Sequence, residues 1–554
     1  MASRKLGTPL FLVVLICVAA LSATAQSFRV QCPTSTVTHP NAANNNSEPT
    51  YVGPTYAGTS GYPAAAAHVN GAIRCQQISG GDGYATMGDG TQTYMFSFGP
   101  LSGLADIAAG KPGTEFPNVF NTVAPITLRP GDPATTDDPT GTGPTNPSAI
   151  NLSSFTYNGA IGLVPNLDCV AEPGTCPNTP ASGLDGHVDP RPLLDVGVMN
   201  GNIPAPLFAI DEDDEFFLTL SNVGMIMRPD LFEQHTVHFH GYPNASAFYD
   251  GVPDASVAIN IGASFTYYYL APDAGTYFWH CHITPPEHLQ MGMVGQLYVR
   301  PRQNRVRVGQ SLLLALQAQQ GDNRTKCDSS QDILCSNPLP RSPNVLLATR
   351  AATGGYAYND GDGSTYYDVE YPLQIHGFDP NFHFVGMTFN PEGFADMKDK
   401  YFLLNGRSYP DTVTSGPLET QSVDGSNHFA QPLPAIINIP AGGKALLRIS
   451  DLDVSEYQTL ASLGIPMQVI AINAKLLRDQ AGNNMYYNTN SITLGGGESL
   501  DVILDASDTT KYPVNSVFYL YTPNLDHLSN DAENFGGLMT EVHIIPASPA
   551  ALVQ

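Results

Sequence analysis

Positive charge is scarce in this sequence, and so is charge of either sign. The 554 residues include 24 Lys and Arg against 50 Asp and Glu, for a formal net charge of −26, and only 13% of the residues are charged. Because nucleic acids are bound through clusters of Lys and Arg, this balance excludes a nucleic acid as the partner. The acidic residues are spread thinly, as is typical of solvated loops.

Long apolar runs are equally scarce. Residues 10–21 form one, preceded by Arg4 and Lys5 and followed by Ala23-Thr24-Ala25, which is the pattern of a secretory signal peptide with its cleavage site. No later stretch reaches the roughly 18 apolar residues that a membrane helix needs. We therefore expect a signal peptide at residues 1–25, no transmembrane segment and a secreted mature protein, extracellular or periplasmic. An uncleaved anchor is the alternative.

Cysteine is limited to eight residues, of which Cys17 falls in the signal peptide and Cys281 in a histidine-rich motif. The remaining six are an even number in an oxidising compartment, so we expect three disulfide bonds. Spacing and elimination favour the pairs Cys169–Cys176, Cys327–Cys335 and Cys32–Cys75.

Glycine and proline are abundant, with 52 and 46 residues, which favours a turn-rich all-β fold over a helical one. The length suits two domains with cores of their own. Asp89-Gly90 between two strand-like runs predicts a hairpin near the start of the first β-sandwich. Residues 101–195 have the composition of a long loop insertion.

Histidine is concentrated in one region. Six of the 14 histidines fall between residues 235 and 288, and the first three form a His-x-x-His-x-His motif at 235–240. Because side chains alternate along a strand, His238 and His240 would share one face and His235 would lie on the other.

The segment around Cys281 follows the same rule. His280 and His282 would share a face, and Cys281 between them would point away. Two strands can therefore offer four imidazoles to one site, and one imidazole with one thiolate to another.

The second of these sites can be completed from the chain that follows Cys281. A thiolate, two imidazoles and a long axial thioether are the ligand set of a blue copper site. We predict that its ligands are His235, Cys281, His288 and Met293, with Met291 as a less favoured axial atom.

Several motifs around these residues resemble the copper domain of the multicopper oxidases. They are Asn200-Gly201-Asn202-Ile203-Pro204-Ala205-Pro206, Tyr249-Asp250-Gly251-Val252-Pro253, the run from Ala274 to His282 and the run from Met291 to Val299. The step from His288 to Met293 matches the family's spacing, whereas the loop from Cys281 to His288 is longer than usual. Residues 402–412, 465–471 and 494–504 resemble a cupredoxin domain without copper.

The resemblance implies an all-β fold of two cupredoxin-like Greek-key β-sandwiches with long loop insertions. We expect an extended arm at residues 26–80, a copper-binding domain at 81–302 and a domain without copper ligands at 303–549. In the second domain, His-x-His pairs are missing and residues 311–316 suit a strand. His376 and His383 are the remaining histidines at a suggestive spacing, and a structural role is favoured over metal ligation for both.

The resemblance also implies roles for individual residues. In the family, electrons pass from a type 1 copper through the cysteine to a type 2 and type 3 copper cluster where dioxygen is reduced, and Asp250 matches an acidic proton donor beside it. The cluster ligands carried over are His238, His240, His280 and His282. These are half of the family's set, so a complete cluster requires assembly between chains, and a symmetric homo-oligomer is the hypothesis.

Three functions are compatible with these residues. The leading one is a secreted multicopper oxidase that uses dioxygen to oxidise phenolic compounds or metal ions such as Mn²⁺ or Fe²⁺. The second is a blue-copper electron-transfer or nitrite-reductase-like protein, which His238 and His282 disfavour. The third is an extracellular copper-binding structural protein.

Overall fold

The structure is a computed structural model, and it describes residues 69–101, 199–319, 348–384, 392–421 and 427–547, with short gaps, together with a few short segments before residue 199. The predicted signal peptide, most of the predicted arm and nearly all of the predicted insertion lie outside the described residues. So do Cys32, Cys169, Cys176, Cys327 and Cys335.

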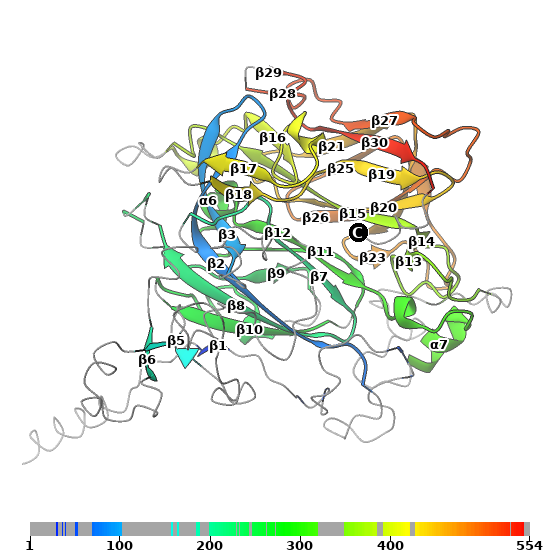
Figure 1. Cartoon of the computed structure of the whole chain (residues 1–554), viewed down its shortest axis with the longest axis horizontal. Coiled ribbons are helices and arrows are strands. Elements are labelled where there is room, and N and C mark those ends of the chain that lie inside the picture. The colour runs from blue at the N-terminus through cyan, green and yellow to red at the C-terminus, as the bar shows by residue number, and fades with distance from the viewer. Residues whose placement is uncertain are drawn as a thin grey trace, which may run out of the picture.

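The described chain forms two β-sandwiches, the first in the lower and the second in the upper part of Figure 1. One sheet of the first sandwich comprises β10 (Ser264–Leu270), β8 (Glu215–Gly224), β2 (Ile73–Thr86) and β3 (Gln92–Pro100), in this order. The other comprises β7 (Ala205–Asp211), β12 (Val294–Arg300), β11 (Gly275–His280) and β9 (His238–His240).

The second sandwich has a seven-stranded and a five-stranded sheet. The larger comprises β16 (Tyr401–Leu404), β15 (Val369–Phe378), β20 (Lys444–Asp451), β26 (Glu498–Asp505), β22 (Met467–Ile472), β23 (Lys475–Leu476) and β24 (Tyr487–Thr489). The smaller comprises β19 (Ile437–Pro440), β30 (Met539–Ile545), β27 (Val517–Tyr521), β21 (Gln458–Leu463) and β25 (Ser491–Leu494). The prediction of an all-β protein with two cupredoxin-like sandwiches is confirmed.

Short elements connect these sheets. Five two-stranded ribbons pair β1 (Arg29–Val30) with β4 (Tyr157–Asn158), β5 (Leu163–Pro165) with β6 (Leu184–Val188), β13 (Gly355–Tyr356) with β14 (Tyr366–Tyr367), β17 (Leu418–Gln421) with β18 (Asn427–Gln431), and β28 (Ser529–Asn530) with β29 (Glu533–Asn534). Among the described residues, the helices are α6 (Pro285–Gln290), α7 (Leu312–Gln319) and the 3₁₀ turns η2 (Ala247–Tyr249), η3 (Arg302–Arg305), η5 (Phe394–Asp396) and η6 (Asp411–Val413).

Two segments differ from what the sequence led us to expect. The strand expected at residues 311–316 is wrong, because Leu312–Gln319 is the helix α7. Its Leu, Ala and Gln residues are strong helix formers, and their apolar run alone does not distinguish a strand from a buried helix. Strand β2 begins at Ile73, inside the segment expected as an arm, and pairs with β3 in the predicted hairpin.

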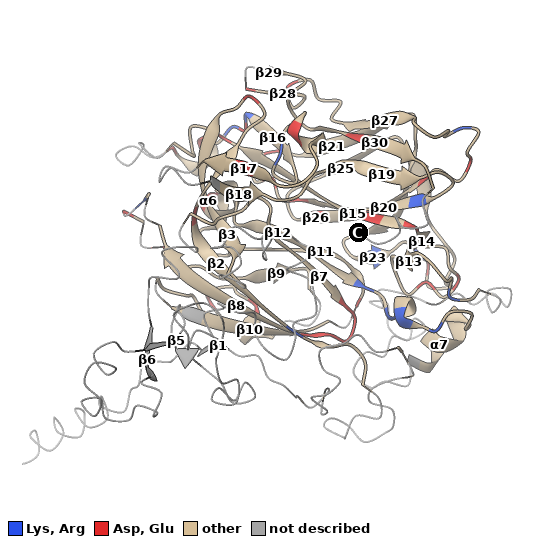
Figure 2. Cartoon of the chain, in the orientation of Figure 1, with Lys and Arg blue, Asp and Glu red and all other residues tan. Residues whose placement is uncertain are grey.

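The two sandwiches share an apolar interface in addition to their separate cores. Phe278 and Val294 of the first sandwich form one buried cluster with Phe378, Leu403 and Leu452 of the second. Strand β11 lies against β20 and β26, so the sheet that carries the predicted histidines faces the seven-stranded sheet. Strands β9 and β11 contain no Lys, Arg, Asp or Glu (Figure 2).

Two other expectations concern covalent and membrane features. Cys75 takes part in a disulfide bond whose partner lies outside the described residues, so its pairing with Cys32 stays a prediction. Neither α6 nor α7, nor any other helix in the described part of the chain, has the length and apolar character of a membrane-spanning segment.

Candidate metal centre

The predicted alternation of side chains is present on β9 and β11. Phe239 and Trp279 lie in the core of the first sandwich together with Cys281, which directly follows β11. His240 and His280 lie on the opposite face, beside a cavity between the sandwiches. One pair of strands therefore separates a thiolate site in the core from a histidine site between the sandwiches.

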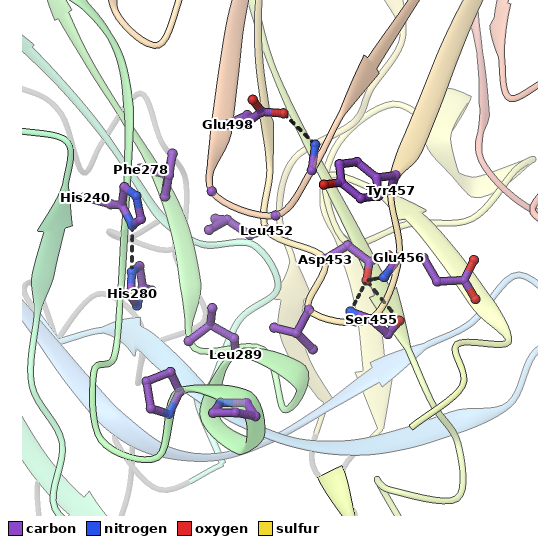
Figure 3. A pocket seen from close by; sticks show the side chains of 16 residues that line it. His240, Phe278, His280, Leu289, Leu452, Asp453, Ser455, Glu456, Tyr457 and Glu498 are labelled. Atoms are coloured by element: carbon purple, nitrogen blue, oxygen red, sulfur yellow. Dashed lines mark hydrogen bonds between the residues drawn. The ribbon is translucent and has the colours of Figure 1, made fainter. Parts of the chain in front are cut away.

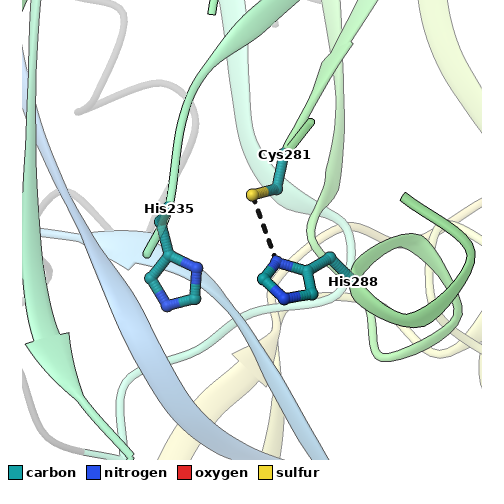
Figure 4. Close-up of side chains that lie close together, drawn as sticks. All are labelled: His235, Cys281 and His288. Carbon is teal, nitrogen blue, oxygen red and sulfur yellow. Dashed lines mark hydrogen bonds between the residues drawn. The ribbon is translucent and has the colours of Figure 1, made fainter. Parts of the chain in front are cut away.

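The thiolate site brings together three buried side chains, His235, Cys281 and His288 (Figure 4). Their potential ligand atoms all lie within 4.8 Å of one another, and His288 Nδ1 is 3.2 Å from Cys281 Sγ. The backbone N–H of Thr236 donates to the same sulfur at 3.4 Å. Both ring nitrogens of His235 are buried without a hydrogen-bond partner. A bound cation would give one of these nitrogens a partner, and buried polar atoms are otherwise nearly always paired.

The neighbouring histidines favour the thiolate form of Cys281, which is the form that binds a metal. Burial disfavours the thiolate, but His288 and His235 together lower the pKa of Cys281 well below its usual value. Burial likewise opposes the charged form of His288, yet the Cys281 sulfur and Glu233 raise the pKa of His288 to about 9. The metal-free site is thus a thiolate beside an imidazolium, and a metal would displace the proton of His288.

A thioether lies next to this group. Met293 is fully buried, and both its Cε and the His235 ring approach Gly80: a Cβ built there would lie 3.4 Å from Met293 Cε and 2.8 Å from His235 Cδ2. Gly80 thus keeps space for the two side chains. Met291 is also buried, but it lines a cavity whose lining includes neither Cys281 nor His235, which favours Met293 as the axial atom.

The unusually long loop between Cys281 and His288 folds as the helix α6, which begins at Pro285. Gln290 Nε2 donates to Asp399 Oδ1 at 2.9 Å, and His383 Nε2 lies 3.0 Å from the carbonyl oxygen of Gln290. The second sandwich thereby fixes the helix that carries His288. His383 has the structural role expected of it.

The histidine site consists of His238, His240 and His280, whose potential ligand atoms lie within 4.8 Å of one another. His240 Nδ1 and His280 Nε2 are 3.2 Å apart. His238 Nδ1 contacts the carbonyl oxygen of Asp250 at 2.6 Å, and His280 Nδ1 contacts that of Cys281 at 2.7 Å. These contacts fix the ring orientations and leave His238 Nε2 and His280 Nε2 for a metal.

These imidazoles are neutral at ordinary pH. Burial lowers the pKa of His280 to about 3, and burial with the neighbouring His238 lowers the pKa of His240 to about 4. Burial also lowers the pKa of His238. Because only the neutral imidazole binds a metal, the three rings are ready as ligands.

Two other predicted residues lie at the edge of this group. The His282 ring is centred 5.1 Å from that of His238 and 5.6 Å from that of His280, but its nitrogens lie outside the three-histidine set. Asp250 Oδ1 is 3.6 Å from His238 Nδ1, and its side chain is one-third exposed. The geometry is compatible with proton donation by Asp250 and also with support of His238.

Sequence reasoning missed two carboxylates beside His288. Glu233 Oε2 lies 3.6 Å from His288 Nε2, close enough for an ion pair but too long for a hydrogen bond. Glu287 joins them in a third group of possible ligands. The nearby imidazole of His288 lowers the pKa of Glu233, whereas burial raises the pKa of Glu287. The position of Glu233 two residues before His235 was the only available signal.

The donor sets indicate which metals fit. A thiolate with two imidazoles and a nearby thioether suits copper, and three imidazoles with an open side suit copper or zinc. The described residues therefore provide one soft site and one nitrogen site, each sufficient for a single ion.

Comparisons with known proteins agree with this chemistry. A family profile described as multicopper oxidase matches residues 187–304. The chain is 34% identical over 112 residues to multicopper oxidase MCE of Talaromyces pinophilus, covering 20% of this chain and 17% of that protein. It is 33% identical over 109 residues to laccase abr2 of Aspergillus fumigatus, covering 19% of this chain and 17% of the relative.

The matches thus span about a sixth of the length of these relatives. Among solved structures, a blue copper oxidase from Nitrosomonas europaea aligns with a TM-score of 0.40 and 21% identity, over 62% of this chain and 78% of that one.

Proposed function

We propose that this chain, whose residues 187–304 match the multicopper oxidase profile, is a secreted copper-dependent oxidoreductase. It takes single electrons from phenolic compounds or from metal ions such as Mn²⁺ or Fe²⁺ and passes them to dioxygen. The observation that carries this proposal is the covalent link between the two candidate sites: Cys281 of the thiolate site and His280 of the histidine site are consecutive residues.

The residues of the thiolate site suit the entry of electrons. His235, Cys281 and His288, with Met293 nearby, would hold a copper ion, which would supply a one-electron redox centre. His288 turns Nδ1 toward the sulfur and Nε2 toward Glu233, whose side chain is partly exposed. The outer edge of His288 is therefore the shortest connection from this site to a reductant.

A cavity of about 470 Å³ lies beside the helix of His288 and offers a place for the reductant. It is lined by aromatic and acidic side chains, including Phe382, Phe384, Phe394, Glu287, Glu392 and Asp230. Aromatic walls favour a phenol, and carboxylates favour a cation. Both reductant classes therefore have a physical basis at the same place.

The backbone suits transfer between the sites. His280 and His282 flank Cys281, and the Nδ1 of His280 contacts the carbonyl oxygen of Cys281 at 2.7 Å. Asp250 next to His238 is the candidate to supply protons, since dioxygen reduction consumes them.

An oxygen electrode tests this function with the copper-loaded protein. We expect dioxygen uptake that depends on a phenol, on Mn²⁺ or on Fe²⁺. Colour without uptake, or a protein that stays metal-free after copper loading, contradicts the proposal.

The choice of reductant is tested with Glu233→Gln, which keeps the size of the side chain and removes its charge. We expect a several-fold higher KM for the metal ion with little change for a phenol. Glu419→Gln, at an exposed position on β17, is the matched control and leaves both values unchanged. Equal effects of Glu233→Gln on both reductants contradict a role for this carboxylate in cation binding.

A further inference from the structure

We infer that the histidine site holds one metal ion per chain, in a chamber that the chain closes with its own second sandwich, rather than half of a cluster shared with a partner chain. The inference relies on the proposed function for the identity of the metal, copper. It departs from the symmetric assembly that the sequence suggested.

The ligand set supports a single ion. Three imidazoles converge, and the 3.2 Å separation of His240 Nδ1 and His280 Nε2 suits two nitrogens that bind the same cation. The chamber wall contributed by the second sandwich contains no His or Cys among the described residues. The described residues of the opposite wall thus provide no second set of ligands, and the nitrogens of the neighbouring His282 lie outside the three-histidine set.

The face that carries these histidines is already covered. Every second side chain of β11 points the same way, so one face carries Thr276, Phe278 and His280. Thr276 Oγ1 donates to Asp501 Oδ1 at 2.5 Å, and Phe278 is buried in the apolar cluster shared with the second sandwich. Around Thr276 and Phe278, this face is therefore occupied by the chain's own second sandwich.

Gly497 marks how closely the second sandwich approaches. A Cβ built on this residue would lie 3.5 Å from His240 Cε1 and 3.7 Å from His240 Nε2. The backbone φ of Gly497 is +96°, a conformation that other residues rarely adopt. The outer edge of the His240 ring therefore lies against this chain's own β25–β26 loop, which occupies the space a partner's ligand would need. Only 16% of the His238 side chain remains exposed.

The remaining space is a chamber of about 580 Å³, with His240 and His280 on one wall and the β20–β21 and β25–β26 loops on the other (Figure 3). Three carboxylates line it, Asp453, Glu456 and Glu498, and no Lys or Arg does. A negative lining disfavours anions. The ligand at the open position of the metal is therefore a small uncharged molecule, such as water or dioxygen.

The test compares copper content with unpaired spin in the fully oxidised, copper-loaded protein. Two isolated Cu²⁺ ions are both visible by electron paramagnetic resonance, whereas adjacent Cu²⁺ ions in a shared cluster couple and lose signal. We expect two copper ions per chain, a spin count equal to the copper count, and the same ratio in monomer and oligomer fractions from gel filtration.

His240→Ala and His543→Ala form a matched pair of variants. Removing His240 is expected to lower the content to one copper per chain while the blue absorption persists. His543 is paired with Glu541 on the outer sheet, so its removal leaves two.

Azide serves as the anionic probe of the chamber. We expect weak azide binding that tightens at least several-fold in Glu498→Gln, whose carboxylate accepts from the N–H of Gly495 at 2.8 Å. An unchanged, tight azide affinity overturns the assignment of an uncharged ligand.

Three results overturn the single-ion inference. They are a spin count well below the copper count, more than two copper ions per chain, and a His240→Ala variant that still binds two copper ions per chain. None of them contradicts the proposed function, because dioxygen uptake is measured separately. A protein that binds no copper at all contradicts the proposed function itself.

Discussion

The two faces of strands β9 and β11 place neighbouring residues in two different candidate metal sites. On the inner face, Cys281 lies in the core of the first sandwich with His235 and His288, all of them buried. On the outer face, His238, His240 and His280 lie beside a chamber that the second sandwich completes. The inner site depends on one domain's core and the outer on how two domains meet, so changes can be designed that affect one site and spare the other.

The largest effect is expected from Cys281→Ser. A serine hydroxyl does not supply the soft thiolate, so the blue absorption and reductant-driven dioxygen uptake are abolished. Copper content falls from two ions per chain to one, because the histidine site is left intact. Visible spectroscopy and copper analysis measure this directly, with thermal unfolding to verify the fold. Persistence of the blue colour would mean that Cys281 is not a ligand.

A change at the interface between the sandwiches is expected to act on stability and on the outer site. Arg448 is fully buried and pairs with Glu370 at 3.1 Å and with Asp501 at 3.7 Å. Arg448→Met leaves the buried Asp501 without its cation and Glu370 with Arg300 alone, and is expected to cost about 3–5 kcal/mol of unfolding free energy. Copper binding at the histidine site should weaken while the blue absorption maximum stays unchanged.

The control for this variant is Lys444→Met on the same strand. Lys444 forms an exposed pair with Asp505 at 2.8 Å, so its loss is expected to cost no more than about 1 kcal/mol. Urea denaturation compares the two variants. Equal destabilisation, or a change in the blue site alone, contradicts the proposed role of the interface.

Gly80→Ala is the converse change, directed at the inner site. The added Cβ would lie 2.8 Å from His235 Cδ2, so the ring must shift. We expect copper affinity at the thiolate site to fall about tenfold, as is common when the support of a ligand is disturbed. Ser79→Ala on the same strand removes only a 3.4 Å hydrogen bond and is the control. An unaltered blue spectrum in Gly80→Ala shows that the ring has room to move.

The smallest effect is a difference in proton release on copper uptake. At pH 7, His288 with a pKa of about 9 must lose its proton, whereas His240 and His280 with pKa values of about 4 and about 3 are already neutral. Affinity at the thiolate site should rise about tenfold per pH unit up to about pH 9, and affinity at the histidine site should be flat above about pH 5. Titration calorimetry in buffers of different ionisation enthalpy separates the two. Equal proton release at both sites is inconsistent with a thiolate–imidazolium pair.

The sequence was sufficient for features that depend on local alternation. Because side chains on a strand point to opposite faces, the separation of Cys281 from His280 was predictable from their adjacency, as was the shared face of His238 and His240. The hairpin at Asp89-Gly90 was also predictable from local sequence, because Asp-Gly between two strand-like runs favours a tight turn. The strand prediction for residues 311–316 was wrong, because an apolar run has no unique period. The helix-forming residues of this segment favour the helix α7 instead.

Features that depend on packing between distant segments were not predictable. Glu233 carried no motif, and its contact with His288 arises only when the β8–β9 connection meets α6. Gly497 lies 257 positions from His240, yet it forms the wall of the histidine site. The symmetric assembly, expected from a count of histidines, stays a prediction, because such a count does not show which face of a sheet is covered.

By itself, the sequence determined the chemical character of the metal ligands and the face of the strand on which each lies, because both follow from residue type and a period of two. Only the tertiary structure decided what surrounds those ligands: which nitrogens are fixed by carbonyl oxygens, which carboxylates approach His288, and which loops close the chamber. These features depend on how one sandwich packs against the other. Such contacts join residues far apart in the sequence, so no local pattern predicts them.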